Sequence, residues 1–150
     1  MSNSLEELAT STFEDVPEEF VLPPGVYIAQ ITRAKLDQTN GTPPSDYIEL
    51  KLNPIEVVES TSELSDDDLA NAMPVWEKLW LTEKARKYTK RVFTNALGMD
   101  NDTVSTTPLG ELVEAMIGQY VKIVTVTEPY KAKDGETKDK VAVKAYKPVP

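Results

Sequence analysis

The sequence predicts a mainly β fold with some α-helix: a closed five-stranded Greek-key barrel that carries a helix between strands 3 and 4. Stretches rich in β-branched and aromatic residues recur between turn signals, three before residue 82 and two after residue 118. Between the two groups, residues 82–118 show helical spacing of apolar residues instead. A chain of 150 residues suits one domain and can bury a core without covalent staples.

The first three strands are expected before residue 82. The first covers residues 26–36 and ends at a turn, where Asn40-Gly41 offers positive φ and Pro43-Pro44 stops a helix. The second, residues 47–52, alternates cleanly and continues irregularly to Val58. Its inner face would carry Ile48, Leu50 and Leu52, and its outer face Tyr47, Glu49 and Lys51. The third strand covers residues 75–81.

Helices and two further strands complete the pattern. An acidic insertion, residues 59–73, holds a short helix that begins after Ser65. A helix capped by Thr82 ends at Gly98, residues 101–106 form a polar loop, and a second helix runs from Thr107-Pro108 to Gly118. In the first of these helices, Ala85, Tyr88, Val92, Phe93, Ala96 and Leu97 fall on one apolar face. Residues 119–127 and 141–146 are the last strands, joined by a hairpin around Asp134-Gly135. The predicted order is therefore three strands, a helical connection and two more strands. This is the order expected of an OB-like barrel.

Composition narrows the classes of function. The chain has no cysteine and no histidine, which excludes disulfides and thiolate metal sites and removes the commonest general base and metal ligand. We therefore expect no enzyme, no metal and no cofactor. The net charge of −9 is uneven, because residues 1–24 and 56–68 each hold six carboxylates and no basic residue, whereas the rest is mildly basic. Residues 1–23 are expected to be a flexible acidic leader, and residues 24–150 the barrel domain with its acidic insertion.

Targeting signals are missing from the sequence. No stretch of about 18 apolar residues is present, so no transmembrane helix is expected. The first 20 residues lack the basic start and the apolar run of a signal peptide. The expected location is the cytoplasm, without a membrane partner.

The third strand holds the sharpest candidate site. Alternation places Leu79 and Leu81 on one face with Glu77, and Trp76, Lys78 and Trp80 on the other. If the leucines face the core, two indoles flank a lysine on the outside, which is the combination that stacks bases and contacts phosphates in single-strand binders. In the alternative, of equal weight, the tryptophans form the core and the leucines pack under a helix or a partner.

Other candidate residues come from neighbouring strands and one loop. Strands two and three are neighbours in such a barrel, so Tyr47 and Lys51, with Arg33 from the first strand, would extend the surface. The basic loop between strands four and five adds Tyr130, Lys131, Lys133 and Lys138, and Lys140 lies in the same cluster. Tyr47 can equally be an ordinary cross-strand aromatic contact, and the loop a solvated hairpin tip.

Several short motifs together resemble a family of small bacteriophage proteins. They are Gly25-Val26-Tyr27, Tyr47-Ile48-Glu49-Leu50, Trp76-Glu77-Lys78-Leu79-Trp80-Leu81 with Glu83-Lys84-Ala85-Arg86, Ile117-Gly118-Gln119-Tyr120-Val121-Lys122, and Ala145-Tyr146-Lys147-Pro148-Val149. The resemblance is to OB-fold proteins associated with single-stranded-DNA binding or recombination, and it covers about residues 24–149. It implies a viral protein of DNA replication or recombination in the host cytoplasm. The chain departs from many single-strand binders in having its acidic blocks near the N-terminus and in the middle, not at the C-terminus.

Two hypotheses follow. The first is sequence-tolerant binding of single-stranded DNA by aromatic stacking and phosphate contacts, with acidic segments that recruit phage or host replication or recombination proteins. The second is a protein-interaction or virion structural component that uses the barrel as a scaffold, because a fold does not fix a function. The sequence leaves the oligomeric state open.

Overall fold

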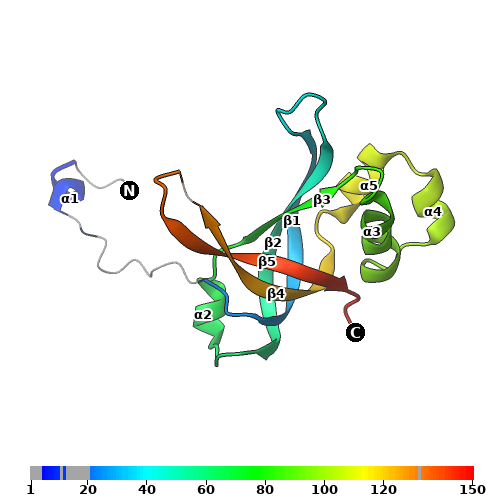
Figure 1. Cartoon of the computed structure of the whole chain (residues 1–150). Coiled ribbons are helices and arrows are strands. Elements are labelled where there is room, and N and C mark those ends of the chain that lie inside the picture. Colours follow the sequence, from blue (N-terminus) through cyan, green and yellow to red (C-terminus); the bar gives the residue numbers. More distant parts are fainter. Residues whose placement is uncertain (1–4, 11, 13–20, 132) are drawn as a thin grey trace.

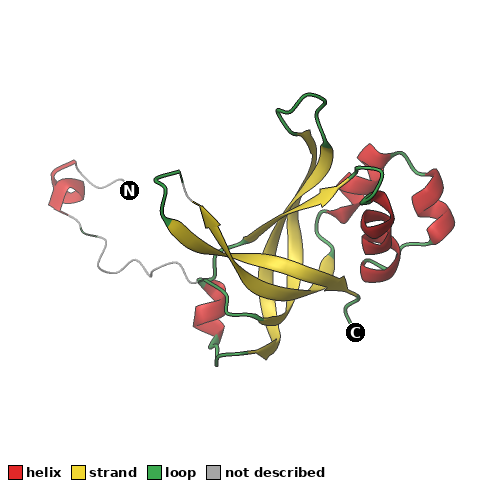
Figure 2. Ribbon diagram, viewed as in Figure 1, coloured by secondary structure: helices red, strands yellow, loops and turns green. Residues whose placement is uncertain are grey.

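The computed structural model describes residues 5–10, 12, 21–131 and 133–150, and its centre is one antiparallel sheet of five strands (Figure 1). The strands are β1 (Gly25–Gln38), β2 (Asp46–Ser60), β3 (Val75–Trp80), β4 (Tyr120–Lys131) and β5 (Thr137–Lys147). Their order in the sheet is β3-β2-β1-β4-β5. The helical segment between β3 and β4 gathers on one side of the sheet (Figure 2). The mainly β class, the five strands and the helical connection are confirmed.

The two edge strands, β3 and β5, are where the structure differs from the closed barrel that we expected. No hydrogen-bonded ladder joins them in the described part of the chain, so the sheet is open. They still approach each other, since the Val143 backbone N–H donates to Glu77 Oε1 at 2.6 Å. A side-chain carboxylate thus accepts the bond that a backbone carbonyl would accept in a ladder.

The hydrophobic core lies on the inner face of this sheet. Its β2 members are Ile48, Leu50 and Leu52, the alternating set predicted from the sequence. Core residues from the other strands and the helical segment include Tyr27, Ile31, Val75, Leu79, Phe93, Leu112, Met116, Val121 and Ile123, and Leu22 joins them from the segment before β1. Tyr27 satisfies its buried hydroxyl by donating to the Pro23 carbonyl at 2.6 Å.

Four helical elements follow β3. They are α3 (Arg86–Arg91), the π-helical turn η1 (Val92–Ala96), α4 (Asn101–Thr106) and α5 (Leu109–Met116). The predicted end at Gly98 is confirmed, since Gly98 has a φ of 68°, a conformation that favours glycine. The predicted stop at Gly118 is also confirmed, with a φ of 89°. The expected cap at Thr82 is wrong, because α3 begins after Ala85 and has no side-chain cap. Before α3, the chain turns through residues 82–85, where the Ala85 N–H donates to the Thr82 carbonyl at 3.0 Å.

Three further local expectations were wrong. Residues 101–106 form helix α4, because the Asp100 carboxylate accepts the Thr103 N–H at 3.1 Å and Val104 is buried beneath the helix. Gly41 does not adopt positive φ, and the turn contains a cis peptide between Thr42 and Pro43. Tyr88 lies 46% exposed on α3 and is not part of its apolar face.

The acidic segments contain two short helices. Helix α2 (Asp66–Ala70) begins at the predicted Ser65, whose hydroxyl accepts the Asp68 N–H at 3.1 Å while Asp68 accepts the Ser65 N–H in return. Helix α1 (Leu5–Thr10) lies in the acidic leader. The prediction that residues 1–23 are flexible falls largely on residues 1–4, 11 and 13–20, which lie outside the described residues.

Candidate nucleic-acid interface

The outer face of β1, β2 and β3 carries a regular array of aromatic and charged side chains. Strand pairing sets Trp80 beside Tyr47, Lys78 beside Glu49, and Trp76 beside Lys51. On the other side of β2, the pairing partners of Tyr47, Glu49 and Lys51 are Asp37, Lys35 and Arg33. We call these nine residues the outer strip.

The two tryptophans face outward, which is one of the two alternatives that the sequence left open. Trp76 is 47% exposed and Trp80 is 37% exposed, whereas Leu79 is only 2% exposed. The alternative, with the indoles in the core, is wrong. The alternation along β3 is therefore preserved in the structure, and both indoles are accessible from solvent.

Each indole contacts an amine from its own sheet. Lys51 Nζ lies 5.5 Å from the ring centroid of Trp76, and Lys78 Nζ lies 5.7 Å from that of Trp80. Lys78 Nζ also lies 4.8 Å from the Tyr47 ring. Such distances are those of cation–π contacts, worth about 0.5–1 kcal/mol each at exposed sites.

Tyr47 packs against Trp80 from the neighbouring strand. Its ring centroid lies 5.2 Å from that of Trp80 with an interplanar angle of 59°, and the tyrosine is only 7% exposed. A ring so covered has no free face for a base. Tyr47 therefore orients Trp80 and Lys78, and any stacking of a ligand falls to the two indoles.

The outer strip is more cationic than the chain as a whole. It contains Arg33, Lys35, Lys51 and Lys78 against two carboxylates, Asp37 and Glu49. Glu49 is engaged by Arg33, with 3.6 Å between Oε1 and Nε. The lysines of the strip therefore provide positive charge beside the indoles, although the whole chain carries −9.

A groove runs along the exposed edge of β3. It has a volume of about 340 Å³ and is lined by Glu49, Trp76, Glu77, Lys78, Trp80 and Lys140. Lys140 belongs to β5, so the open seam between the edge strands brings it to the tryptophans. One wall of the groove is therefore aromatic, and the other carries a further amine.

Glu77 lies at this seam and is the most perturbed carboxylate among the described residues. Burial raises its pKa above the ordinary value, and the Val143 N–H and the Lys140 charge partly oppose this effect. Burial, followed by the nearby Glu77 charge, raises the pKa of Tyr146 well above its usual value. These shifts follow from the partly buried carboxylate that bridges the open seam.

The candidate residues of the β4–β5 hairpin lie apart from the outer strip. The exposed side chains are Tyr130, Lys131, Lys133 and Lys138, and Lys138 Nζ lies 3.6 Å from Asp134 Oδ2. The Asp134-Gly135 turn itself is as predicted, with a φ of 85° at Gly135. None of these four residues lines the groove beside the tryptophans, which Lys140 reaches in their place.

The structure thus unites six of the sequence-predicted residues: Arg33, Tyr47, Lys51, Trp76, Lys78 and Trp80. Lys35 was not among the candidates, and Lys140 was expected only as one of the basic residues of the β4–β5 loop. Lys35 could have been found, because it follows Arg33 by two residues in a strand. Lys140 depends on how β5 approaches β3, which no local pattern encodes.

Two further searches were negative within the described ranges. No group of three or more His, Cys, Asp or Glu side chains there could hold a metal ion. None of the helices there combines the length and the apolar character needed to cross a membrane.

Two comparisons of the sequence with known proteins gave no match. No protein-family model matches the chain, and no curated protein is significantly similar to it in sequence.

Proposed function

We propose that this protein binds single-stranded DNA without strong sequence preference, through the outer strip and the adjoining groove. The observation that carries the proposal is the pair of half-exposed indoles on β3, each held beside an amine. Bases stack on such rings whatever their sequence, because every base has a π-face, and each stack is worth about 1–3 kcal/mol. The neighbouring lysines and Arg33 would contact the phosphates.

The strand order supports an OB-like interpretation of the sheet. β1 lies between β2 and β4, and the edges β3 and β5 come together at Glu77. A partly open five-stranded barrel of that kind binds oligonucleotides on the face of its second and third strands, flanked by the loops between strands 1 and 2 and between strands 4 and 5. The outer strip lies on the corresponding strands here. On this interpretation, Tyr130, Lys131, Lys133 and Lys138 would contact DNA beyond the groove.

The distribution of acid supports the same site. The carboxylates of residues 56–68 lie at the far end of β2 and in α2, which Figure 1 places below the sheet. At 0.1 M salt, screening limits the effect of an exposed charge to about 10 Å. The potential at the outer strip is therefore set by the strip's own cations and not by these distant carboxylates. A role in phage DNA replication or recombination, with the acidic segments as contacts for partner proteins, follows from the sequence resemblance and belongs to this proposal.

The test is a titration of fluorescein-labelled oligo-dT, longer than about 16 nucleotides, followed by anisotropy. Wild-type protein is expected to bind, and Trp76→Ala with Trp80→Ala to weaken binding by about 30-fold or more, because two stacks are lost. Tyr88→Ala is the matched control, since Tyr88 is a similarly exposed aromatic residue outside the strip and the groove. Its affinity should equal that of the wild type.

Two outcomes would contradict the proposal. The first is equal binding by the double variant and the wild type, which would remove the stacking argument. The second is no binding by the wild type at about 0.1 M salt, which would leave the scaffold function as the better hypothesis.

A further inference from the structure

The groove along β3 contains a carboxylate between its two indoles. Strand pairing places Glu49 opposite Lys78, and the cross-strand rows on either side of this pair end in Trp76 and Trp80. Glu49 and both indoles line the groove of about 340 Å³. A negative charge repels phosphates, so a carboxylate at this position does not serve attraction of the DNA backbone. Its chemistry suits a different part of a nucleotide.

The spacing of the indoles determines what can lie over Glu49. Trp76 and Trp80 are four residues apart in one strand, so their Cα atoms lie about 13 Å apart at a rise of about 3.3 Å per residue. Neighbouring bases of a stacked strand are only about 3.4 Å apart. Two bases that stack on the two indoles are therefore not neighbours in the DNA. At least one base lies between them, over the row of Glu49 and Lys78.

The Glu49 carboxylate keeps acceptor capacity for such a base. Its Oε1 lies 3.6 Å from Arg33 Nε, which is an ion pair but is longer than a hydrogen bond. Its cross-strand partner Lys78 directs Nζ toward the rings of Tyr47 and Trp80, at 4.8 and 5.7 Å. The Glu49 side chain is 28% exposed, so a base in the groove can reach its oxygens.

Glu77 is the other carboxylate that lines this groove, and it already has a structural role. Its Oε1 accepts the Val143 N–H at 2.6 Å and links the two edge strands. By alternation it shares the inner face of β3 with Leu79, whereas Glu49 is on the outer face of β2. Glu49 is therefore the carboxylate of the groove that is available to a ligand.

A carboxylate distinguishes bases by their hydrogen-bond donors. It accepts a hydrogen bond from the N4 amine of cytosine, and adenine offers a similar amine at N6. Thymine has the acceptor O4 in place of this amine, and a carboxylate repels an acceptor. A base placed against Glu49 is therefore favoured when it carries an exocyclic amine.

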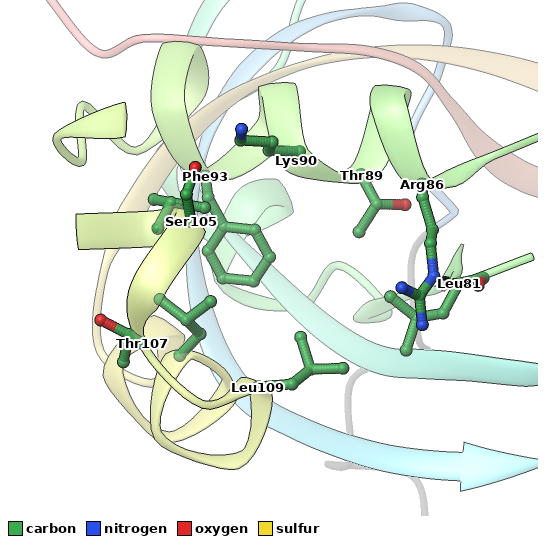
Figure 3. A pocket seen from close by; sticks show the side chains of 10 residues that line it. Leu81, Arg86, Thr89, Lys90, Phe93, Ser105, Thr107 and Leu109 are labelled. Carbon is green, nitrogen blue, oxygen red and sulfur yellow. Dashed lines mark hydrogen bonds between the residues drawn. The ribbon is translucent and has the colours of Figure 1, made fainter. Parts of the chain in front are cut away.

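The larger cavity lined by the helical segment has a different chemistry (Figure 3). Its charged residues are Arg86 and Lys90, and its other lining residues are apolar or carry hydroxyls. The cavity beside it contains Asp37 and Asp46, but no aromatic residue lines that cavity. The groove along β3 combines stacking rings with an accessible carboxylate, which neither of these cavities does.

We propose that Glu49 contacts the base held between the two indoles and favours bases with an exocyclic amine over thymine. This inference rests on the proposed DNA binding and adds a local preference to it. One contact of this kind corresponds to about a fivefold difference in affinity, so the protein stays tolerant of sequence.

Anisotropy titrations with fluorescein-labelled oligo-dC and oligo-dU of equal length test the inference. Uracil lacks the thymine methyl group, so the two ligands differ only in the hydrogen-bonding edge of the base. The wild type should bind oligo-dC about fivefold more tightly than oligo-dU. Glu49→Gln should bring this ratio close to one, because an amide can accept from the cytosine amine or donate to the uracil O4.

Glu114→Gln is the matched control, since it removes the same charge from an exposed residue of α5 that does not line the groove. It should keep the wild-type ratio, and circular dichroism checks that both variants are folded. The inference alone is refuted if the wild type binds both ligands equally, or if folded Glu49→Gln keeps the wild-type ratio. Binding of neither ligand by the wild type would refute the proposed function as well.

Discussion

Glu77 is the residue whose replacement tests the construction of the sheet most directly. Its carboxylate accepts the Val143 N–H at 2.6 Å and links two edge strands that no ladder joins. Glu77→Ala removes the acceptor and leaves the donor without its partner. Glu77→Gln keeps an oxygen acceptor of the same reach.

The size of the effect follows from the kind of bond. A hydrogen bond to a charged group contributes about 1.5–3 kcal/mol to stability, and an unsatisfied buried donor costs about 1–3 kcal/mol. Removing the carboxylate also relieves the cost of burying its charge. We expect Glu77→Ala to lower the free energy of unfolding by about 1–3 kcal/mol, and Glu77→Gln by clearly less.

The pH dependence of the comparison has a definite sign. Burial raises the pKa of Glu77 in the folded state above its ordinary value of 4.5. Between the unfolded and the folded pKa the folded state binds more protons, so this group's contribution to stability falls as pH rises through that window. Glu77→Gln does not titrate. The stability of the wild type relative to Glu77→Gln should therefore be higher near pH 4 than near pH 7.

Urea unfolding followed by tryptophan fluorescence measures these differences, and amide hydrogen exchange at Val143 reports the bond itself. Glu49→Gln is the matched control, since it makes the same chemical change on the neighbouring strand, where a partly exposed pair with Arg33 is worth about 0–1 kcal/mol. Unchanged stability and unchanged Val143 protection in Glu77→Ala would show that the seam does not depend on this carboxylate.

Further predictions concern the site and the fold. Lys78→Ala should make the salt dependence of DNA binding less steep, by about 0.7 in the slope of log K against log salt for one lost phosphate contact, measured by anisotropy titrations at several salt concentrations. Gly25→Ala should lower stability by about 1–3 kcal/mol in urea unfolding, because a Cβ there would overlap the Glu59 carbonyl oxygen of β2. Asp100→Ala should cost about 0.5–2 kcal/mol and increase amide exchange within α4, because it removes the side chain that caps this helix.

The fold was predictable where alternation is strict. In β2, Ile48, Leu50 and Leu52 mark the inner face in the sequence and are at most 1% exposed in the structure. Helix α4 could not be found in this way. Its six residues bury one side chain, Val104, and a single apolar residue has no period. Asp100 can be recognised as the N-cap residue of α4 only when the position of the helix is already known.

Predictions about the site succeeded within strands and failed between them. The outward direction of Trp76 and Trp80 follows from their spacing to Leu79, and the structure agrees. The open seam between β3 and β5 could not be predicted, because the sequence shows Glu77 only as a residue on the same face of β3 as Leu79. Only the approach of β5 makes it the link to Val143 and brings Lys140 to the indoles. Contacts between elements far apart in sequence are set by packing, and local pattern does not report them.

The cation–π contacts of the free protein affect how the proposed binding would work. Lys51 and Lys78 rest on the indoles at 5.5 and 5.7 Å, so a stacking base must displace them. The lost contacts cost about 0.5–1 kcal/mol each, less than the 1–3 kcal/mol of a stack. The displaced amines then lie beside the bound DNA, where they can donate hydrogen bonds to its phosphates. Stacking and phosphate contacts would then be coupled at each indole.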